Sequence, residues 1–489
     1  MTTNTRPIPD LSGLEPAIVW THFATLCRIP RQSKQEAALR EHLQHWASER
    51  GLESTVDAAG NLIIRKAASK GRENAPGTIL QAHLDMVCQK NTETVHDFSR
   101  DAIVPVLRDG WLRAENTTLG ADNGIGVALA LAVLEDRSLC HGPIEALFTV
   151  DEEAGMGGAR GLESGVLNGR LMLNLDTEEW GEFYLGCAGG QDVNVARCGV
   201  AEPLPADFSA WRVALGGLRG GHSGVDIHQE RGNAIKLLVR ALNDLALHMP
   251  LRLSRLEGGT ARNALPREAF AEIGVAKDDE AVLHERLRSW QACFKAELHG
   301  ADDGVSLSCQ ATSIAQIMSS HEQSVWLASL HAAPHGVRRM SRQLPGVVET
   351  SCNLGMVALT PTESSCNFLV RSLIDSGNEA LADEIISLFS LSGTRAGKSG
   401  GYPGWTPKPD SALLALCQSV YRRAYGSDAK VQVIHAGLEC GLIGAKYPGL
   451  DIVSFGPTIR GPHAPGEAVD VASVARTWTL LTSILAAIE

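Results

Sequence analysis

Acidic residues and histidines follow several apolar segments of this 489-residue chain. The residues that end three such segments, TILQAH, IEALFTVDEE and LMLNLD, are His83, Glu152, Glu153 and Asp176. Imidazole nitrogens and carboxylate oxygens are ligands that zinc prefers, and a carboxylate that binds no metal is able to act as a base. These residue types predict metal-assisted hydrolysis.

Three further residues join this set on weaker grounds. Asp85 lies two residues after His83 and is placed to hold its second ring nitrogen, although a polar pair at a strand end is the simpler interpretation. Asp122, in LGADNGIG, precedes an apolar helix and also suits an N-cap. His463, in GPHAPGE, is in isolation a solvated loop residue. As a set they fit a two-cation site, because a carboxylate is able to bridge metals about 3.5–4 Å apart.

The adjacent pair Glu152 and Glu153 needs an explanation, because neighbouring carboxylates repel each other. On a strand, successive side chains point to opposite faces. Strand alternation would therefore let one glutamate bind a metal while the other faces the water that reacts.

The elements that position these residues alternate between strands and helices. Strands are expected at NLIIRKA, TILQAHLD, IEALFTVDEE and RLMLNLDTEE, with helices over 34–50 and 124–136. This order predicts an α/β fold with a mixed, mostly parallel sheet flanked by helices. Sites in such sheets lie beyond the carboxyl ends of the strands, where the acids are.

The pattern changes after about residue 187 to α+β order and returns to α/β order in the tail. We expect a catalytic domain from residues 1–187 and 403–489, with the tail strands completing the first sheet. An inserted α+β lid domain over 188–402 is expected to contain two subdomains in tandem. The Gly-, Pro- and Ser-rich stretch 392–410 predicts a flexible boundary or hinge.

Composition limits the classes of function. A formal net charge of -12 argues against nucleic acid as a partner. The longest apolar run is far below the about 20 residues that span a bilayer, and MTTNTRPIPDLSGLEP has no signal-peptide core. The 11 cysteines include no CxxC pair. We expect a cytoplasmic protein without a membrane or nucleic-acid partner.

The motifs QAHLDMVCQK, LGADNGIG, DEEAGMGGA, LRGGHSGVDIH and HAGLECG carry a family resemblance that extends over essentially the whole chain. The chain resembles the co-catalytic zinc peptidases that include aminoacylase, carnosinase and glutamate carboxypeptidase. Within that group it is most similar to the aminoacyl-histidine (Xaa-His) dipeptidases.

The resemblance implies a role for each residue of the metal set. Asp122 bridges two metals, His83 and Asp176 complete the ligands of one, and Glu153 and His463 complete those of the other. Asp85 orients His83, and Glu152 is the general base. In this family the peptide bond after the bridging aspartate, here Asp122–Asn123, tends to be cis.

The resemblance also implies residues that contact the substrate. His222, otherwise a solvated loop residue, would donate to the oxyanion. Arg371, otherwise half of a surface ion pair, would bind a free carboxylate. Asn263, which also suits a turn, would contact substrate. Glu439, which also suits a helix N-terminus, is able to hold a substrate ammonium.

The sequence therefore predicts a dizinc dipeptidase that hydrolyses Xaa-His and related unblocked dipeptides, with Glu152 as general base. Manganese or cobalt are expected substitutes for the two zinc ions. An N-acyl amino acid deacylase is the alternative on the same metal core, and a catalytically dead scaffold would lack the glutamates that are present. We expect a homodimer in which each chain supplies its own His222.

Overall fold

The computed structural model describes residues 11–408 and 410–489, so most of the N-terminal stretch quoted above lies outside the described residues. The described backbone falls into two compact units. The first comprises residues up to 186 with 407–433 and 438–489, and the second comprises 187–406 with 434–437. The domain bounds 1–187, 188–402 and 403–489 stay a prediction.

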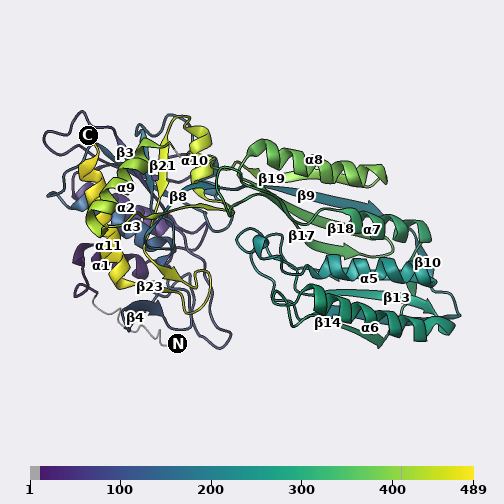
Figure 1. The fold of residues 1–489 in the computed structure, drawn as a ribbon. Helices are drawn as coiled ribbons and strands as arrows, with labels where there is room; N and C mark the ends of the chain where they lie inside the picture. The colour runs from purple at the N-terminus through teal and green to yellow at the C-terminus, as the bar shows by residue number, and fades with distance from the viewer. Residues whose placement is uncertain (1–10, 409) are drawn as a thin grey trace. The chain divides into compact units, whose positions relative to one another are not determined.

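The first unit has an α/β fold, in which helices flank a mixed β-sheet, and this confirms the predicted fold class (Figure 1). Its sheet has the strand order β1(Glu53–Val56), β2(Leu62–Lys66), β6(Ile144–Thr149), β3(Thr78–His83), β7(Leu171–Asn174), β21(Asp451–Ser454), β8(Glu182–Cys187), β20(Lys430–Ile434). Its helices are α1(Ala17–Arg28), α2(Ala37–Glu49), α3(Ala121–Glu135), α4(Gly157–Gly161), α9(Ala412–Tyr425), α10(Glu439–Lys446) and α11(Val471–Ala487).

Parallel strands form the centre of this sheet. β3 pairs in parallel with β6 and β7, and β21 pairs in parallel with β7. The strands are buried along their whole length in β3 and β6, as expected for a parallel sheet covered on both faces. As predicted, tail strands complete the sheet, so purple and yellow elements mix in Figure 1.

A small antiparallel sheet in the first unit carries the loop of one predicted metal ligand, His463. Its strand order is β22(Ile459–Arg460), β23(Ala468–Asp470), β5(Trp111–Ala114), β4(Pro105–Arg108). The loop between β22 and β23 contains His463, and the chain after β5 leads into α3. This sheet therefore brings the chain on either side of residue 463 close to the start of α3.

The second unit is built on a large antiparallel sheet and also contains a two-stranded sheet of β10(Ala201–Pro203) and β15(Gln316–Met318). The strand order of the large sheet is β14(Ser306–Ala311), β11(Phe208–Gly216), β13(Ala269–Ala276), β12(Leu251–Gly258), β17(Val348–Leu359), β18(Glu363–Ser372), β9(Gly189–Cys198), β19(Arg395–Tyr402), with β16(Gly336–Met340) beside β17. Its helices are α5(Ala234–His248), α6(Glu280–Glu297), α7(Ser320–Ala332) and α8(Asp375–Leu391). Alternate strand residues such as Val193, Val213 and Phe368 pack with the helices in one core.

The sheet contains two repeats of the order βαββαβ, and one repeat is nested in the other. The strands β11, β12, β13 and β14 enclose α5 and α6, and lie in the order β14-β11-β13-β12. The strands β9, β17, β18 and β19 take the same relative order with α7 and α8. Since the first repeat falls between β9 and α7 in the chain, the repeats are not in simple tandem. They join through β12 and β17 into a single sheet.

The expectation of a flexible stretch over 392–410 is wrong for residues 395–402. These residues form β19, which pairs antiparallel with β9. Glycine and serine disfavour a strand in isolation, but the backbone groups of β9 provide a template that outweighs that preference. β19 forms an edge of the sheet, where such residues are tolerated.

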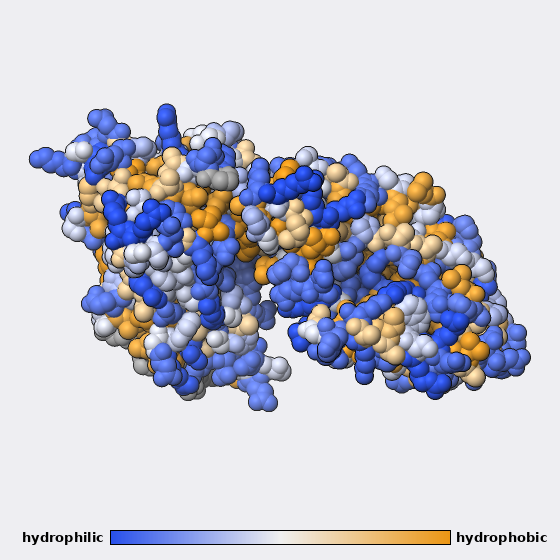
Figure 2. Space-filling model, viewed as in Figure 1, coloured by the Kyte–Doolittle hydropathy of each residue, from blue (hydrophilic) through white to orange (hydrophobic). Residues whose placement is uncertain are grey.

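Polar and charged residues cover much of the face drawn in Figure 2, with apolar residues interspersed. Among the described residues, no helix combines the length and the apolar character needed to cross a membrane.

We predict that Leu242→Ala in α5 destabilises the second unit by about 2–5 kcal/mol, because a buried cavity remains where the side chain packed. Leu242 is 0% exposed, whereas Leu247 on the same helix is 83% exposed. Leu247→Ala is therefore the matched control. Calorimetry should show a lower thermal midpoint for Leu242→Ala alone, and equal midpoints for the two variants would contradict the packing described above.

Candidate metal centre

The predicted metal ligands come from separate elements of the first unit that meet at one edge of its sheet. Because β3, β6 and β7 run parallel side by side, their carboxyl ends lie together. The candidate ligands are His83 at the end of β3, Asp122 at the start of α3, Glu153 after β6, Asp176 after β7 and His463 between β22 and β23.

Asp122 lies between the two histidines. Its Oδ1 is 3.2 Å from Nε2 of His83, and its Oδ2 is 3.1 Å from Nε2 of His463. The Asp122–Asn123 peptide bond is cis, as the resemblance implies. The buried Asn123 side chain donates to the carbonyl oxygen of Leu175 at 2.6 Å, which ties this turn to the residue before Asp176. Each oxygen of one carboxylate thus faces a different imidazole.

The other two acids complete two overlapping clusters. Asp176 Oδ1 is 3.4 Å from Nε2 of His83, and Glu153 Oε2 is 3.1 Å from Nε2 of His463. Potential ligand atoms of His83, Asp122 and Asp176 lie within 4.8 Å of one another, as do those of Asp122, Glu153 and His463. A third grouping of this kind is His83, Glu152 and Glu153.

These residues fit a pair of divalent cations. Glu153 Oε1 is buried and accepts no hydrogen bond from the described residues, and the buried Asp176 Oδ1 has only its long 3.4 Å contact with His83. Buried acceptors of this kind need a partner, and a cation that also binds the imidazoles would supply one. The mixture of imidazole nitrogens and carboxylate oxygens suits zinc and similar metals.

The pKa shifts of the cluster residues also indicate that the clusters favour added positive charge. Burial raises the pKa of Asp176 to about 6, against the lowering effect of His83. Hydrogen bonds to Asp122 and Glu153 raise the pKa of His463 to about 11. Burial also raises the pKa of Glu152 well above its usual range. Without metal, protons compensate the clustered carboxylates, and metal binding would release them.

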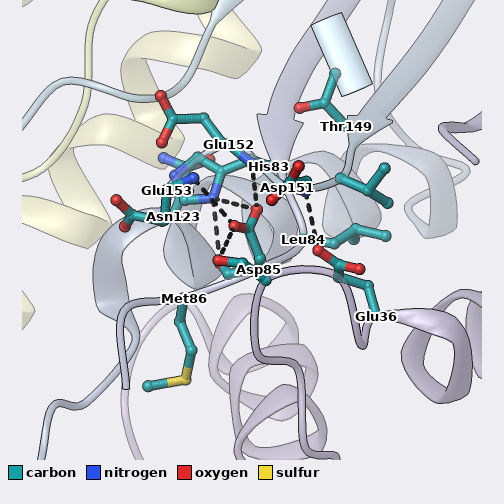
Figure 3. Close-up of polar contacts among 12 residues, drawn as sticks. Glu36, His83, Leu84, Asp85, Met86, Asn123, Thr149, Asp151, Glu152 and Glu153 are labelled. Carbon is teal, nitrogen blue, oxygen red and sulfur yellow. Dashed lines mark hydrogen bonds and ion pairs between the residues drawn. The ribbon is translucent and has the colours of Figure 1, made fainter. Parts of the chain in front are cut away.

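Asp85 holds the loop of the two glutamates as well as His83. Nδ1 of His83 is 3.1 Å from the Asp85 carbonyl oxygen and 3.4 Å from Oδ1. The Asp85 carboxylate also accepts the backbone N–H groups of Glu152 and Glu153, at 3.0 and 3.1 Å (Figure 3). Burial would raise the pKa of Asp85, but His83, Ser33 and the Glu152 N–H lower it to about 2.

Both adjacent glutamates lie in the turn after β6 and not on the strand, so the explanation from strand alternation is wrong. β6 ends at Thr149, and Asp151 has a left-handed φ of 56°. The backbone there turns so that two successive N–H groups point at Asp85. Held in this way, Glu153 faces His463 while the partly buried Glu152 lies in the third grouping beside His83.

Glu439 is the first residue of α10 and contacts the same edge of the sheet through β3 and the end of β6. It is 0% exposed, and its Oε2 accepts hydrogen bonds from Gln81 at 2.7 Å and Thr149 at 2.6 Å. Its Oε1 accepts none from the described residues. Burial raises the pKa of Glu439 to about 7. The side chain thus has one fixed oxygen and one that a further donor would satisfy.

The remaining predicted residues belong to the second unit. Arg371 is the penultimate residue of β18, and its Nη1 donates to the Tyr402 hydroxyl at 2.8 Å. Its Nη2 is 3.4 Å from Nε2 of His222. Nδ1 of His222 accepts the N–H groups of Gly224 and Val225, which assigns the ring proton to Nε2. Two donors therefore converge, a geometry that suits an anionic oxygen.

Asn263 is exposed, and its backbone oxygen accepts the N–H of Ser223 at 2.8 Å. This contact places Asn263 in the loop that lies beside His222. Its predicted contact with substrate stays a prediction.

Several residues around the metal ligands are not identified by the sequence analysis. Arg31, Ser33 and Glu36 lie in the loop between α1 and α2, and Glu467 follows His463 by four residues. Glu36 accepts the N–H of Asp151 at 2.9 Å, as Figure 3 shows. In the sequence, Arg31, Ser33 and Glu36 could have been noticed as part of the polar stretch RQSKQE, and Glu467 as the acid within GPHAPGE.

Two overlapping histidine–carboxylate clusters at the carboxyl edge of an α/β sheet are typical of metal-dependent hydrolases. The model of peptidase family M20/M25/M40 matches residues 79–487. The chain is 46% identical over 479 residues to the cytosol non-specific dipeptidase of Escherichia coli (strain K12), covering 97% of this chain and 98% of that protein. The chain belongs to the M20/M25/M40 peptidase family and is a hydrolase that acts on peptide bonds.

Solved structures agree with this assignment. The aminoacylhistidine dipeptidase from Vibrio alginolyticus superposes with a TM-score of 0.89 and 44% identity, over 98% of both chains. An aminopeptidase from Bacillus cereus, 18% identical with a TM-score of 0.56 over 97% of this chain and 99% of that chain, shares the fold.

We predict that Glu153→Ala reduces bound metal from two ions per chain toward one, because the cluster with Asp122 and His463 loses a carboxylate. Metal content after dialysis against a weak chelator measures the effect. Glu163→Ala is the control, since Glu163 is exposed and belongs to none of the clusters. Retention of two ions by Glu153→Ala, with unchanged affinity, would remove Glu153 from the ligand set.

Proposed function

We propose that this protein is a cytoplasmic dizinc dipeptidase that hydrolyses Xaa-His and related dipeptides with free termini. The position of Asp122 between two imidazoles is the main support, because it suits a carboxylate that bridges two cations. The names of the similar proteins support the dipeptidase activity, and one of them supports the cytoplasmic location.

In this proposal His83, Asp122 and Asp176 hold one zinc ion, and Asp122, Glu153 and His463 hold the other. Bound zinc would lower the pKa of a coordinated water and polarise the peptide carbonyl. Asp85 fixes the orientation of His83 and of the turn that carries the two glutamates. Manganese or cobalt would serve the same donor set.

Glu152 acts as the general base. A carboxyl oxygen of Glu152 takes a proton from the attacking water and returns it to the leaving amine nitrogen. Burial raises its pKa, which brings a carboxylate closer to the basicity that proton transfer near neutrality requires. Asp85 accepts the Glu152 backbone N–H and so fixes the turn from which the side chain of the base extends.

Residues outside the metal set bind the two ends of the substrate. Arg371, with its guanidinium fixed by Tyr402, binds the free carboxylate, and Asn263 contacts the substrate. His222 donates from Nε2 to the oxyanion that develops at the carbonyl. Glu439 holds the substrate ammonium through its second carboxyl oxygen. The active protein is proposed to be a homodimer in which each chain supplies its own His222.

We predict that Glu152→Gln lowers kcat by about 100- to 10,000-fold, the range attributed to a general base. The variant should still bind two zinc ions, because the amide keeps the size of the side chain and Glu153 is unchanged. Metal analysis and turnover are measured on the same preparation. Near-normal turnover in Glu152→Gln would end its assignment as the base.

The choice of substrate is tested by assaying the zinc enzyme on Gly-His, β-Ala-His, Leu-Gly, a tripeptide, a dipeptide amide and an N-acetyl amino acid. We expect turnover of the free dipeptides. Arg371→Met should raise KM for free dipeptides while leaving the dipeptide amide unaffected, because the amide lacks the carboxylate that Arg371 binds. Hydrolysis of the N-acetyl amino acid alone would instead identify a deacylase.

A further inference from the structure

Glu467 is a buried acid in the same loop as His463. It immediately precedes β23, and its residue is 2% exposed. Its own N–H donates to the carbonyl oxygen of Ala464, and the N–H of Gly466 donates to that of Thr117. The His463 loop is therefore closed on itself and attached to the chain that leads into α3.

The Glu467 carboxylate accepts four successive backbone N–H groups. Oε2 accepts from Leu119 at 2.8 Å and Gly120 at 2.9 Å. Oε1 accepts from Ala121 at 2.7 Å and Asp122 at 3.1 Å. The first N–H groups of a helix lack partners within the helix and favour a nearby negative charge. A side chain 345 residues distant from Asp122 in the chain thus fixes the backbone of that residue.

Arg31 holds the same turn from its carbonyl side. Its Nη1 donates to the carbonyl oxygens of Leu84 at 2.9 Å and Asp85 at 3.0 Å, and its Nη2 donates to that of Gly120. Gly120 has a left-handed φ of 72°, and an added Cβ would lie 2.4 Å from Nη2 of Arg31. A side chain at this position would crowd Arg31 and strain the backbone, and hydrogen bonds from Arg31 and to Glu467 hold the turn from both sides.

We propose that Glu467 is the positioning residue that fixes the bridging carboxylate of Asp122 relative to His463, and so sets the geometry of the cation site that these residues share with Glu153. Glu467 uses both carboxyl oxygens on backbone N–H groups, so it acts through Asp122 and is not itself a ligand. The inference rests on the metal site of the proposed function, but it does not depend on which peptide is hydrolysed.

The test is Glu467→Gln, which keeps the size of the side chain but replaces one acceptor oxygen by an NH₂ group. Part of the row of four N–H groups would then face a donor, and the turn should shift. Zinc is titrated calorimetrically into the metal-free protein. We expect the weaker of two binding steps to lose about 10- to 100-fold in affinity, the cost typical of residues that orient metal ligands. The absorption spectrum of the cobalt-loaded protein should change with it.

The matched control is Glu145→Gln. Glu145 is 6% exposed and accepts the backbone N–H groups of Asn168 and Gly169 at 2.7 and 2.8 Å, at the opposite end of β6 from the metal ligands. It thus has the same chemistry without a link to Asp122. We expect Glu145→Gln to lower the thermal midpoint while keeping wild-type zinc affinities and the wild-type cobalt spectrum.

Wild-type zinc affinities and cobalt spectrum in Glu467→Gln would overturn the proposal, as would an equal loss of zinc affinity in Glu145→Gln. If Glu467→Gln does not fold, Glu467→Asp replaces it. Aspartate keeps both oxygens but reaches less far, so its zinc affinity should fall in the same step, and an unchanged affinity overturns the proposal. Failure of the dipeptidase assignment would instead appear as wild-type protein that binds zinc and cleaves no dipeptide.

Discussion

The first unit depends on the electrostatic cost of gathering carboxylates at one buried sheet edge. Asp122, Glu153 and Asp176 lie within reach of two imidazoles, with Glu152 beside them. Like charges this close raise one another's energy, and burial removes the water that would screen them. Histidine protons compensate that charge in part, as the raised pKa of His463 shows. Divalent cations would neutralise the carboxylates more completely, so metal binding would also stabilise this edge of the sheet.

A second layer of charge keeps this arrangement in place. Asp85 and Glu467 are both buried carboxylates, and each accepts backbone N–H groups of a loop that carries candidate ligands. Arg31 lies between them and donates to carbonyl oxygens on both sides. Backbone hydrogen bonds leave these side chains no freedom to bind metal themselves. The ligands are therefore oriented before a cation arrives, which lowers the cost of ordering them on binding.

Much of the first unit could be predicted because its signals are local. An apolar segment followed by an acid marks the carboxyl end of a buried strand, and parallel pairing then brings His83 and Asp176 together. The roles of Arg31 and Glu467 could not be predicted, because their contacts join residues far apart in the chain and one sequence does not reveal such pairs. In the second unit, the start of α8 could not be predicted because it begins with Asp375 and with neighbours that are typical of turns. β19 could not be predicted because it is a strand only through its pairing with β9. The nesting of one repeat inside the other likewise depends on strand order, which periodicity does not encode.

The two units present different polar groups, and within each unit the hydrogen bonds determine which atoms are left over. The first unit concentrates acceptor oxygens that call for cations or donors. The second unit concentrates donors, because two backbone N–H groups occupy Nδ1 of His222 and leave the proton on Nε2, facing the guanidinium of Arg371. Tyr402 fixes that guanidinium from its other nitrogen. A dipeptide carries an ammonium, a carboxylate and a carbonyl that becomes anionic during hydrolysis, so it requires acceptors and donors in turn. An N-acyl amino acid carries no ammonium, so it would need the same metal ligands but no acceptor for a charged amine, and the termini of the substrate would then separate a dipeptidase from a deacylase.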